Sequence, residues 1–167
     1  MNSERHEFPG ITELSLIVYR GAVKTGGGTA AEECLSLFAR NGWGGGWTDG
    51  IHPYHHFHAT THEALGIVKG SARVRFGGRS GPVVAVEAGD AVIIPAGISH
   101  FNEGATDDLV VVGAYPGGRQ PDMERSGSDE ITEGARKRVR AVPLPEADPV
   151  FGKDGPLVRS WGRRTRD

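Results

Sequence analysis

The chain has 167 residues, of which 37% are hydrophobic and 24% charged, a size that predicts one globular domain over residues 1–167. Its formal net charge of -2 gives no basic bias, which argues against binding to nucleic acid or to an anionic membrane surface. Its single cysteine, Cys34, excludes an intrachain disulfide and a thiolate metal cluster.

The N-terminal part predicts one strand and one helix over residues 11–42. The opening MNSERHEFPG lacks the apolar region of a signal peptide, and no run of about 18 apolar residues follows, so we expect a cytoplasmic protein. Residues 13–20, ELSLIVYR, have the composition of a partly buried strand. Thr29 and Glu32 have capping-box spacing, and apolar residues then recur at helical intervals as far as Phe38.

The middle of the chain predicts a sandwich or barrel with its core at about residues 50–115. The glycine-rich stretch 43–50 carries Trp43 and Trp47 and suits either a turn or the rim of a pocket. Short apolar runs without a helical period follow at 64–69, 72–76, 83–87, 91–94 and 109–115. Several short strands at this spacing are typical of an all-β domain.

The C-terminal part predicts a second helix and a wrapping segment over residues 128–161. Residues 116–128 have the composition of an exposed loop. Ser128 is the expected cap of a helix whose apolar stripe is Ile131, Ala135 and Val139. The proline-rich segment that follows is too apolar for a free tail, and we expect it to cover the barrel. A basic cluster suits a solvated tail and comprises Arg159, Arg163, Arg164 and Arg166.

The segment HPYHHFHATTHE places five histidines and one glutamate within residues 52–63. Side chains alternate between the two faces of an extended strand, so His56 and His58 point the same way and His55 points the other. Two imidazoles on one face, two residues apart, can share a metal ion. Tyr54 has the same parity and is expected at the same wall.

Two spaced motifs resemble those of the cupin family. The first consists of Gly50, His56, His58, Glu63 and Gly70, with gaps of five, one, four and six residues, and it matches at every defined position. The second is carried by Gly89, Pro95, Gly97 and His100. The asparagine usual four residues after the histidine is replaced by Gly104, whereas Asn102 lies on the face of His100. The motifs and their spacer cover about a third of the chain.

This resemblance implies an all-β fold, the cupin double-stranded β-helix or jelly-roll barrel, with one or two short peripheral helices. It also implies that His56, His58, Glu63 and His100 are metal ligands. Three imidazoles and one carboxylate suit Fe, Mn, Ni, Co, Cu or Zn better than Mg or Ca, and we expect one divalent transition metal, namely Mn, Fe, Ni or Zn. An octahedral ion would keep two positions open, whereas a closed tetrahedral zinc would only connect strands.

The activity stays open because cupins include dioxygenases, oxalate-degrading enzymes, sugar isomerases and sensors. The four-residue gap before Glu63 is similar to that of germin-like oxalate oxidases and decarboxylases, and the whole chain is similar to small bacterial cupins of unassigned activity. We favour a metal-dependent oxidoreductase or lyase acting on a small-molecule substrate rich in oxygen, such as a dicarboxylic acid or enediol, with Tyr54 or Asn102 orienting it. The alternatives are a non-catalytic binding or sensing protein and a sugar isomerase or epimerase.

Other expectations concern the surroundings of the ion and the assembly. His55 and His62 should face away from it, with His62 orienting the Glu63 carboxylate, and Trp47 is a further pocket candidate. A homodimer is expected because cupins of this size are often dimeric and because an exposed strand such as 13–20 needs covering.

Overall fold

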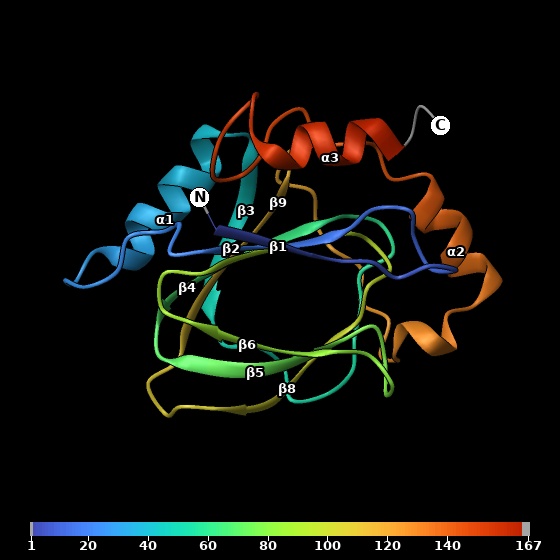
Figure 1. Ribbon diagram of the computed structural model, residues 1–167, viewed down its shortest axis with the longest axis horizontal. Helices are drawn as coiled ribbons and strands as arrows, with labels where there is room; N and C mark the ends of the chain where they lie inside the picture. Colours follow the sequence, from blue (N-terminus) through green and yellow to red (C-terminus); the bar gives the residue numbers. More distant parts are fainter. Residues whose placement is uncertain (1, 165–167) are drawn as a thin grey trace.

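The computed structural model describes residues 2–164, and the side chains of residues 2–162. Its strands form two antiparallel sheets that lie one above the other (Figure 1). The six-stranded sheet has the order β1 (Asn2–His6), β2 (Leu16–Arg20), β7 (Ala91–Ile94), β4 (Glu63–Lys69), β9 (Val110–Pro116) and β3 (Trp43–Asp49). The three-stranded sheet has the order β6 (Val83–Glu87), β5 (Ser71–Phe76) and β8 (His100–Ala105).

The four central strands of the six-stranded sheet, β2, β7, β4 and β9, are buried on both faces, which explains their continuous apolar sequences. In β2, Leu16 and Val18 join the core between the sheets, whereas Ile17 and Tyr19 join a second core on the outer face. In β5 only alternate residues are buried, so that Val74 faces the core and Arg73 faces outward. Strands with continuous apolar residues therefore belong to the sheet that is packed on both faces, and strands with alternating apolar residues belong to the sheet with one solvent-exposed face.

Two helices provide that cover on the outer side of the six-stranded sheet (Figure 1). Helix α1 (Ala30–Arg40) buries Ala30, Cys34 and Phe38 there. Helix α3 (Pro156–Arg164) buries Leu157 and Trp161. The Trp161 indole nitrogen also donates to the carbonyl of Ser15, at 2.9 Å, so its polar atom is satisfied inside the core.

The second predicted helix begins later than expected. Ser128 starts a short 3-10 turn, η1 (Ser128–Glu130), and helix α2 (Glu133–Arg140) follows. The N-cap of α2 is Thr132, whose side chain accepts from the backbone nitrogen of Ala135. Ser128 is not the cap because its buried hydroxyl is used by a turn of the barrel, where it donates to the carbonyl of Gly97 at 2.7 Å.

Other elements also differ from the prediction. The polar N-terminal segment forms β1 and pairs with β2, so β2 is not an edge strand and needs no partner chain to cover it. The wrapping segment ends in α3, which is a third α-helix instead of one or two. That helix contains Arg159, Arg163 and Arg164, which were expected in a tail, while Arg166 lies outside the described residues.

The glycine-rich stretch forms an edge strand, β3, over Trp43–Asp49 instead of a turn, and its second half lines a pocket, which was the other expectation. Its pairing with β9 shifts register between Gly44 and Trp47, as in a β-bulge. Gly113 of β9 makes room for the Trp47 indole, because a Cβ atom there would lie 2.1 Å from that ring. The absence of a side chain at Gly113 thus leaves space on β9 for the Trp47 indole of the neighbouring strand.

The two antiparallel sheets confirm the predicted all-β fold. Within residues 2–164, none of the helices has the length and apolar character needed to cross a bilayer.

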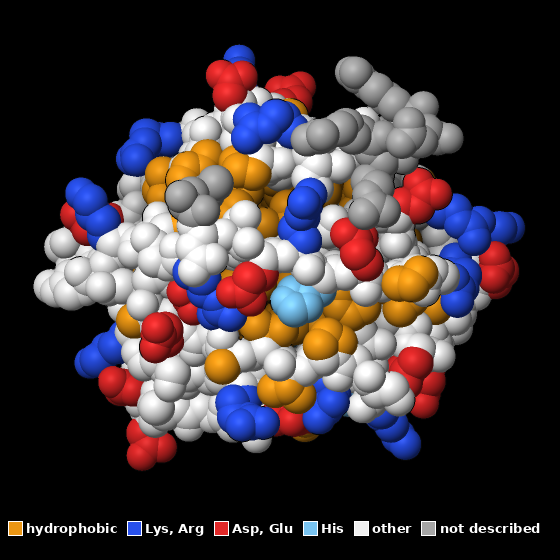
Figure 2. Space-filling view, in the orientation of Figure 1, with side chains coloured by type: hydrophobic (Ala, Val, Ile, Leu, Met, Phe, Trp, Pro, Cys, Tyr) orange, Lys and Arg blue, Asp and Glu red, His pale blue; other side chains and the backbone are white. Residues whose placement is uncertain are grey.

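The face of the molecule in Figure 2 intersperses cationic and anionic side chains, with hydrophobic atoms between them, and shows no large patch of one charge.

Candidate metal centre

The histidine-rich segment reaches the site in an extended conformation. His56 forms an antiparallel bridge with His100, the first residue of β8, and its carbonyl accepts from the His100 backbone nitrogen at 2.9 Å. Phe57 bridges to Glu124 instead. The alternation expected from the sequence therefore brings His56 and His58 to one side. Glu63 arrives at the same place as the first residue of β4.

Three imidazoles converge at this point. One ring nitrogen from each of His56, His58 and His100 lies within 4.8 Å of the others, and all three residues are buried. The Oε1 atom of Glu63 lies 3.2 Å from Nε2 of His100 and 3.4 Å from Nε2 of His58. The four residues named from the two motifs are thus neighbours in space.

Backbone carbonyls orient the three rings. The Nδ1 atom of His56 lies 3.3 Å from the carbonyl oxygen of Tyr54, that of His58 lies 2.5 Å from Asp122, and that of His100 lies 3.5 Å from Ile98. A carbonyl only accepts, so a neutral ring carries its proton on Nδ1 and leaves Nε2 with a free lone pair. This tautomer is the one that can bind a metal through Nε2.

The Glu63 carboxylate fits a metal better than it fits a hydrogen bond. Its Oε1 atom is buried and has no hydrogen-bond partner among the described residues, although two Nε2 atoms are close. With the ring protons on Nδ1, the Nε2 atoms of His58 and His100 lie close to this oxygen but cannot donate to it. A buried acceptor of this kind requires a partner, and a cation among the four side chains would supply one.

Burial and neighbouring charges shift the pKa values of the site residues in opposite directions. Burial alone would raise the pKa of Glu63, but His100 and His58 outweigh it and hold that pKa below its ordinary value. Burial lowers the pKa of His56 to about 3, helped by the nearby His100. For His58 burial also lowers the pKa, but contact with Glu63 outweighs it and the pKa is raised. Without metal, these pKa directions favour a protonated His58 beside an ionised Glu63, and a cation would displace that proton.

The centre opens into a cavity of about 500 Å³. Its wall includes apolar side chains from β3, the histidine-rich segment, β4 and the loop after β9, namely Trp47, Ile51, Pro53, Leu65, Pro121 and Met123. Trp47, a pocket candidate from the sequence, donates from its indole nitrogen to the Tyr115 hydroxyl at 2.8 Å. The predicted pocket therefore exists beside the imidazoles and has room for more than one water molecule.

Tyr54 and Asn102, named as substrate-orienting residues, do not line this cavity in the described structure. The Tyr54 ring stacks on His52, with centroids 4.8 Å apart, and the Arg125 guanidinium lies 3.8 Å from its centroid. Asn102 donates from its amide to the carbonyl of Ile51 at 3.3 Å and accepts from the backbone nitrogen of Gly104. Both stabilise the segment that leads to His56, and their role toward a substrate stays a prediction.

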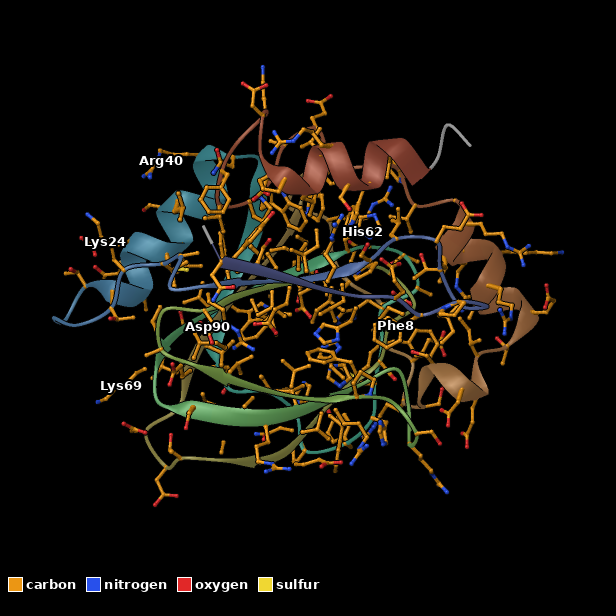
Figure 3. The ribbon with its side chains drawn as sticks, viewed as in Figure 1. Phe8, Lys24, Arg40, His62, Lys69 and Asp90 are labelled. Atoms are coloured by element: carbon orange, nitrogen blue, oxygen red, sulfur yellow. The ribbon has the colours of Figure 1, made fainter. Side chains whose placement is uncertain are left out.

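Two other histidines of the segment, His55 and His62, lie away from the imidazole cluster, whereas His52 contacts His56 and lines the cavity. His55 stacks on Phe101, with ring centroids 4.7 Å apart. His62 is fully buried beneath α3, where it contacts Trp161 (Figure 3). Its Nδ1 accepts from the backbone nitrogen of Ala96 at 2.9 Å, so it anchors the turn before β8. No hydrogen bond joins it to Glu63 among the described residues.

Sequence reasoning missed two residues of the site. Asp122 lies in the segment expected to be an exposed loop, yet its backbone holds His58 and its side chain binds residues 59 and 60. Tyr115 closes β9 beside the cavity, and burial raises the pKa of its hydroxyl above the ordinary value, with Glu63 adding to the effect. The polar run PDME gave no signal, because its composition is that of any turn.

Comparisons with known proteins identify one close relative. No protein-family model matches the chain. The "Uncharacterized protein YjlB" of Bacillus subtilis (strain 168) is 39% identical over 153 residues, which are 92% of this chain and 89% of the relative. An identity of this size over nearly the whole of both chains establishes common descent.

Solved structures give partial and remote matches. Acireductone dioxygenase from Bacillus anthracis, with cadmium in its active centre, is 20% identical with a TM-score of 0.38, covering 51% of this chain and 58% of that one. A mutant of Bacillus subtilis oxalate decarboxylase is 18% identical with a TM-score of 0.37, covering 66% and 22%. The TDP-quinovose 3,4-ketoisomerase WlaRB from Campylobacter jejuni is 10% identical with a TM-score of 0.37, covering 42% and 59%. This chain spans less than two thirds of each solved chain, and none of them defines its activity.

The two motifs, the two-sheet fold and the converging imidazoles agree with the family resemblance seen in the sequence. The chain belongs to the same family as Bacillus subtilis YjlB.

Proposed function

We propose that this protein is a mononuclear metal-dependent enzyme that acts on a small oxygen-rich substrate. His56, His58, His100 and Glu63 would hold one divalent transition metal. The observation that carries the proposal is the convergence of three imidazoles whose Nδ1 atoms face backbone carbonyls, next to a buried carboxylate oxygen without a hydrogen-bond partner. A bound metal would supply Lewis-acid or redox chemistry there.

The surrounding residues support catalysis more than a purely structural ion. A structural zinc site is closed, and cysteine is its commonest ligand, whereas here the only cysteine is buried against Phe38 in the outer core. The imidazoles border a cavity large enough for a substrate. Trp47 and Tyr115 form a hydrogen-bonded wall on one side, and the Tyr115 hydroxyl keeps its proton at neutral pH, so it can donate to a substrate oxygen.

The first experiment measures metal content in protein purified without an affinity tag. We expect one transition-metal ion per chain by elemental analysis, and less than a tenth of that in the variants His56→Ala and Glu63→Ala. His55→Ala is the matched control, because this histidine stacks on Phe101 and lies outside the cluster. Equal metal in all four proteins would refute the assignment of the ligands.

The second experiment tests turnover. Metal-loaded protein and its His56→Ala variant are compared for oxygen uptake and product formation across a panel of small hydroxy acids, keto acids and enediols. We expect metal-dependent product from at least one compound. Tight binding with the compound recovered unchanged would favour a sensing or binding protein instead.

A further inference from the structure

The charged residues that line the cavity beside the imidazoles all have the same sign. They are Asp49, Glu63 and Asp122, and no lysine or arginine lines this cavity in the described part of the chain. Asp49 lies at the exposed rim, whereas Glu63 is buried. The only fixed charges of this lining, apart from the metal itself, are therefore negative, and the rest of it is apolar or neutral polar.

A charge count at the centre shows how much negative charge the site can accept. A divalent ion with three neutral imidazoles and the Glu63 carboxylate carries one net positive charge. One negative charge on the substrate would neutralise it. A second would lie in a partly buried space next to carboxylates, with no cationic side chain of the lining to pair with it.

Asp122 cannot move aside to relieve this repulsion. Its Oδ1 atom accepts from the backbone nitrogens of Ala59 and Thr60, at 2.9 and 3.0 Å, and from the Thr60 hydroxyl at 2.8 Å. Its carbonyl also holds His58. The negative charge is thus fixed at the wall.

The apolar part of the cavity wall favours a substrate that carries an apolar group. Ile51, Leu65 and Met123 line the cavity together with Trp47, and the volume of about 500 Å³ exceeds what a two-carbon acid would fill. Met123 is 46% exposed, which is unusual for a large apolar side chain and leaves it available to a ligand. Burial of an apolar group against this wall would add to affinity.

We infer that the substrate carries one singly charged or neutral oxygen-chelating group and an uncharged, apolar remainder, and that dicarboxylic acids are poor ligands. This inference rests on the proposed function, because it places the chelating group at the metal. It narrows the substrate class expected from the sequence, in which a dicarboxylic acid stood beside an enediol.

Three hydroxamates with the same chelating group test it. Acetohydroxamate has no tail, benzohydroxamate has an apolar ring, and 4-carboxybenzohydroxamate adds one negative charge. Binding to the cobalt-loaded protein is measured by calorimetry and by the cobalt absorption spectrum. We expect benzohydroxamate to bind at least tenfold more tightly than acetohydroxamate, and its carboxylated form at least tenfold more weakly than benzohydroxamate.

Variants assign the effects to residues. Met123→Ala should reduce the advantage of benzohydroxamate over acetohydroxamate several-fold, and Asp49→Asn should reduce the penalty on the carboxylated probe. Arg125→Ala serves as the control, because Arg125 is the cation on Tyr54 outside the lining, and it should leave both ratios unchanged.

The outcomes separate the inference from the function on which it rests. If acetohydroxamate changes the cobalt spectrum but the three probes bind alike, or the carboxylated probe binds best, the inference is overturned and the metal site stands. If the carboxylated probe loses affinity only in Arg125→Ala, then Arg125 binds the second negative charge of the probe. That result also overturns the inference. If no probe changes the spectrum of the cobalt-loaded protein, the ion has no position open to a substrate, and both the inference and the proposed enzymatic function fail.

Discussion

Replacing Asp122 tests whether the loop after β9 holds the metal centre in place. In Asp122→Ala, the Oδ1 atom that accepts from Ala59 and from both donors of Thr60 is lost. A hydrogen bond contributes about 1 kcal/mol net, so three that share one acceptor are worth about 2–3 kcal/mol. For a chain of this length, that corresponds to a fall in Tm of roughly 5–10 °C.

The same change should weaken metal binding, although Asp122 is not one of the proposed ligands. Without its side-chain bonds, the Asp122 backbone is no longer fixed, and its carbonyl can leave Nδ1 of His58. Loss of a group that orients a ligand histidine typically costs about 10–100-fold in metal affinity. Competition with a chromogenic chelator measures this affinity, and thermal unfolding of the metal-free protein measures the stability.

Asp122→Asn is the matched variant because its amide oxygen can still accept from Ala59 and Thr60. We expect it to keep most of the metal affinity and to lose less than half of the Tm change seen in the alanine variant. If both variants bind metal as tightly as the original protein, the loop does not position His58. If both lose affinity equally, the charge of Asp122 matters and the hydrogen bonds do not.

Three further predictions concern stability and assembly. Burial lowers the pKa of His62 from 6.5 to about 4, so below pH 6.5 the unfolded chain takes up a proton first and stability falls. At pH 5.5 this loss of stability amounts to about 1.4 kcal/mol. Urea titrations at pH 7.5 and 5.5 should show that His62→Gln removes this part of the pH dependence. If the pH dependence of the variant equals that of the original protein, His62 is not its source. Gly113→Ala would place a methyl group 2.1 Å from the Trp47 indole, so thermal unfolding should show a loss of about 1–3 kcal/mol, and a variant as stable as the original would contradict this packing. Light scattering at micromolar concentration should give twice the chain mass of 17.8 kDa, whereas the single mass would remove the predicted homodimer.

The sequence predicts the site better than it predicts the periphery. Alternation along an extended segment was sufficient to pair His56 with His58 and to place His55 on the other face. Glu63 and His100 were found through spaced motifs, because both start strands whose positions are set by turns with defined glycines. In each case the residue type and its spacing carry the geometry.

The features that could not be predicted depend on contacts between residues that are far apart in the sequence. The polar residues 2–6 form β1 because β2 offers an unpaired edge, and their own composition gives no strand signal. Likewise, Ser128 looks like a helix cap until the turn at Gly97 and Ser99 claims its hydroxyl. Asp122 has the composition of a loop residue, and only the folded chain brings it against residues 58–60.

The outer core is completed by residues that follow the strands they cover. Leu157 and Trp161 complete the layer over β2, β4 and β7, so a growing chain carries an uncovered apolar sheet until α3 has been added and has packed. Transiently exposed apolar surface of this kind favours aggregation. Chaperones would therefore have to shield this surface during that interval, although the candidate metal ligands precede α3 in the chain.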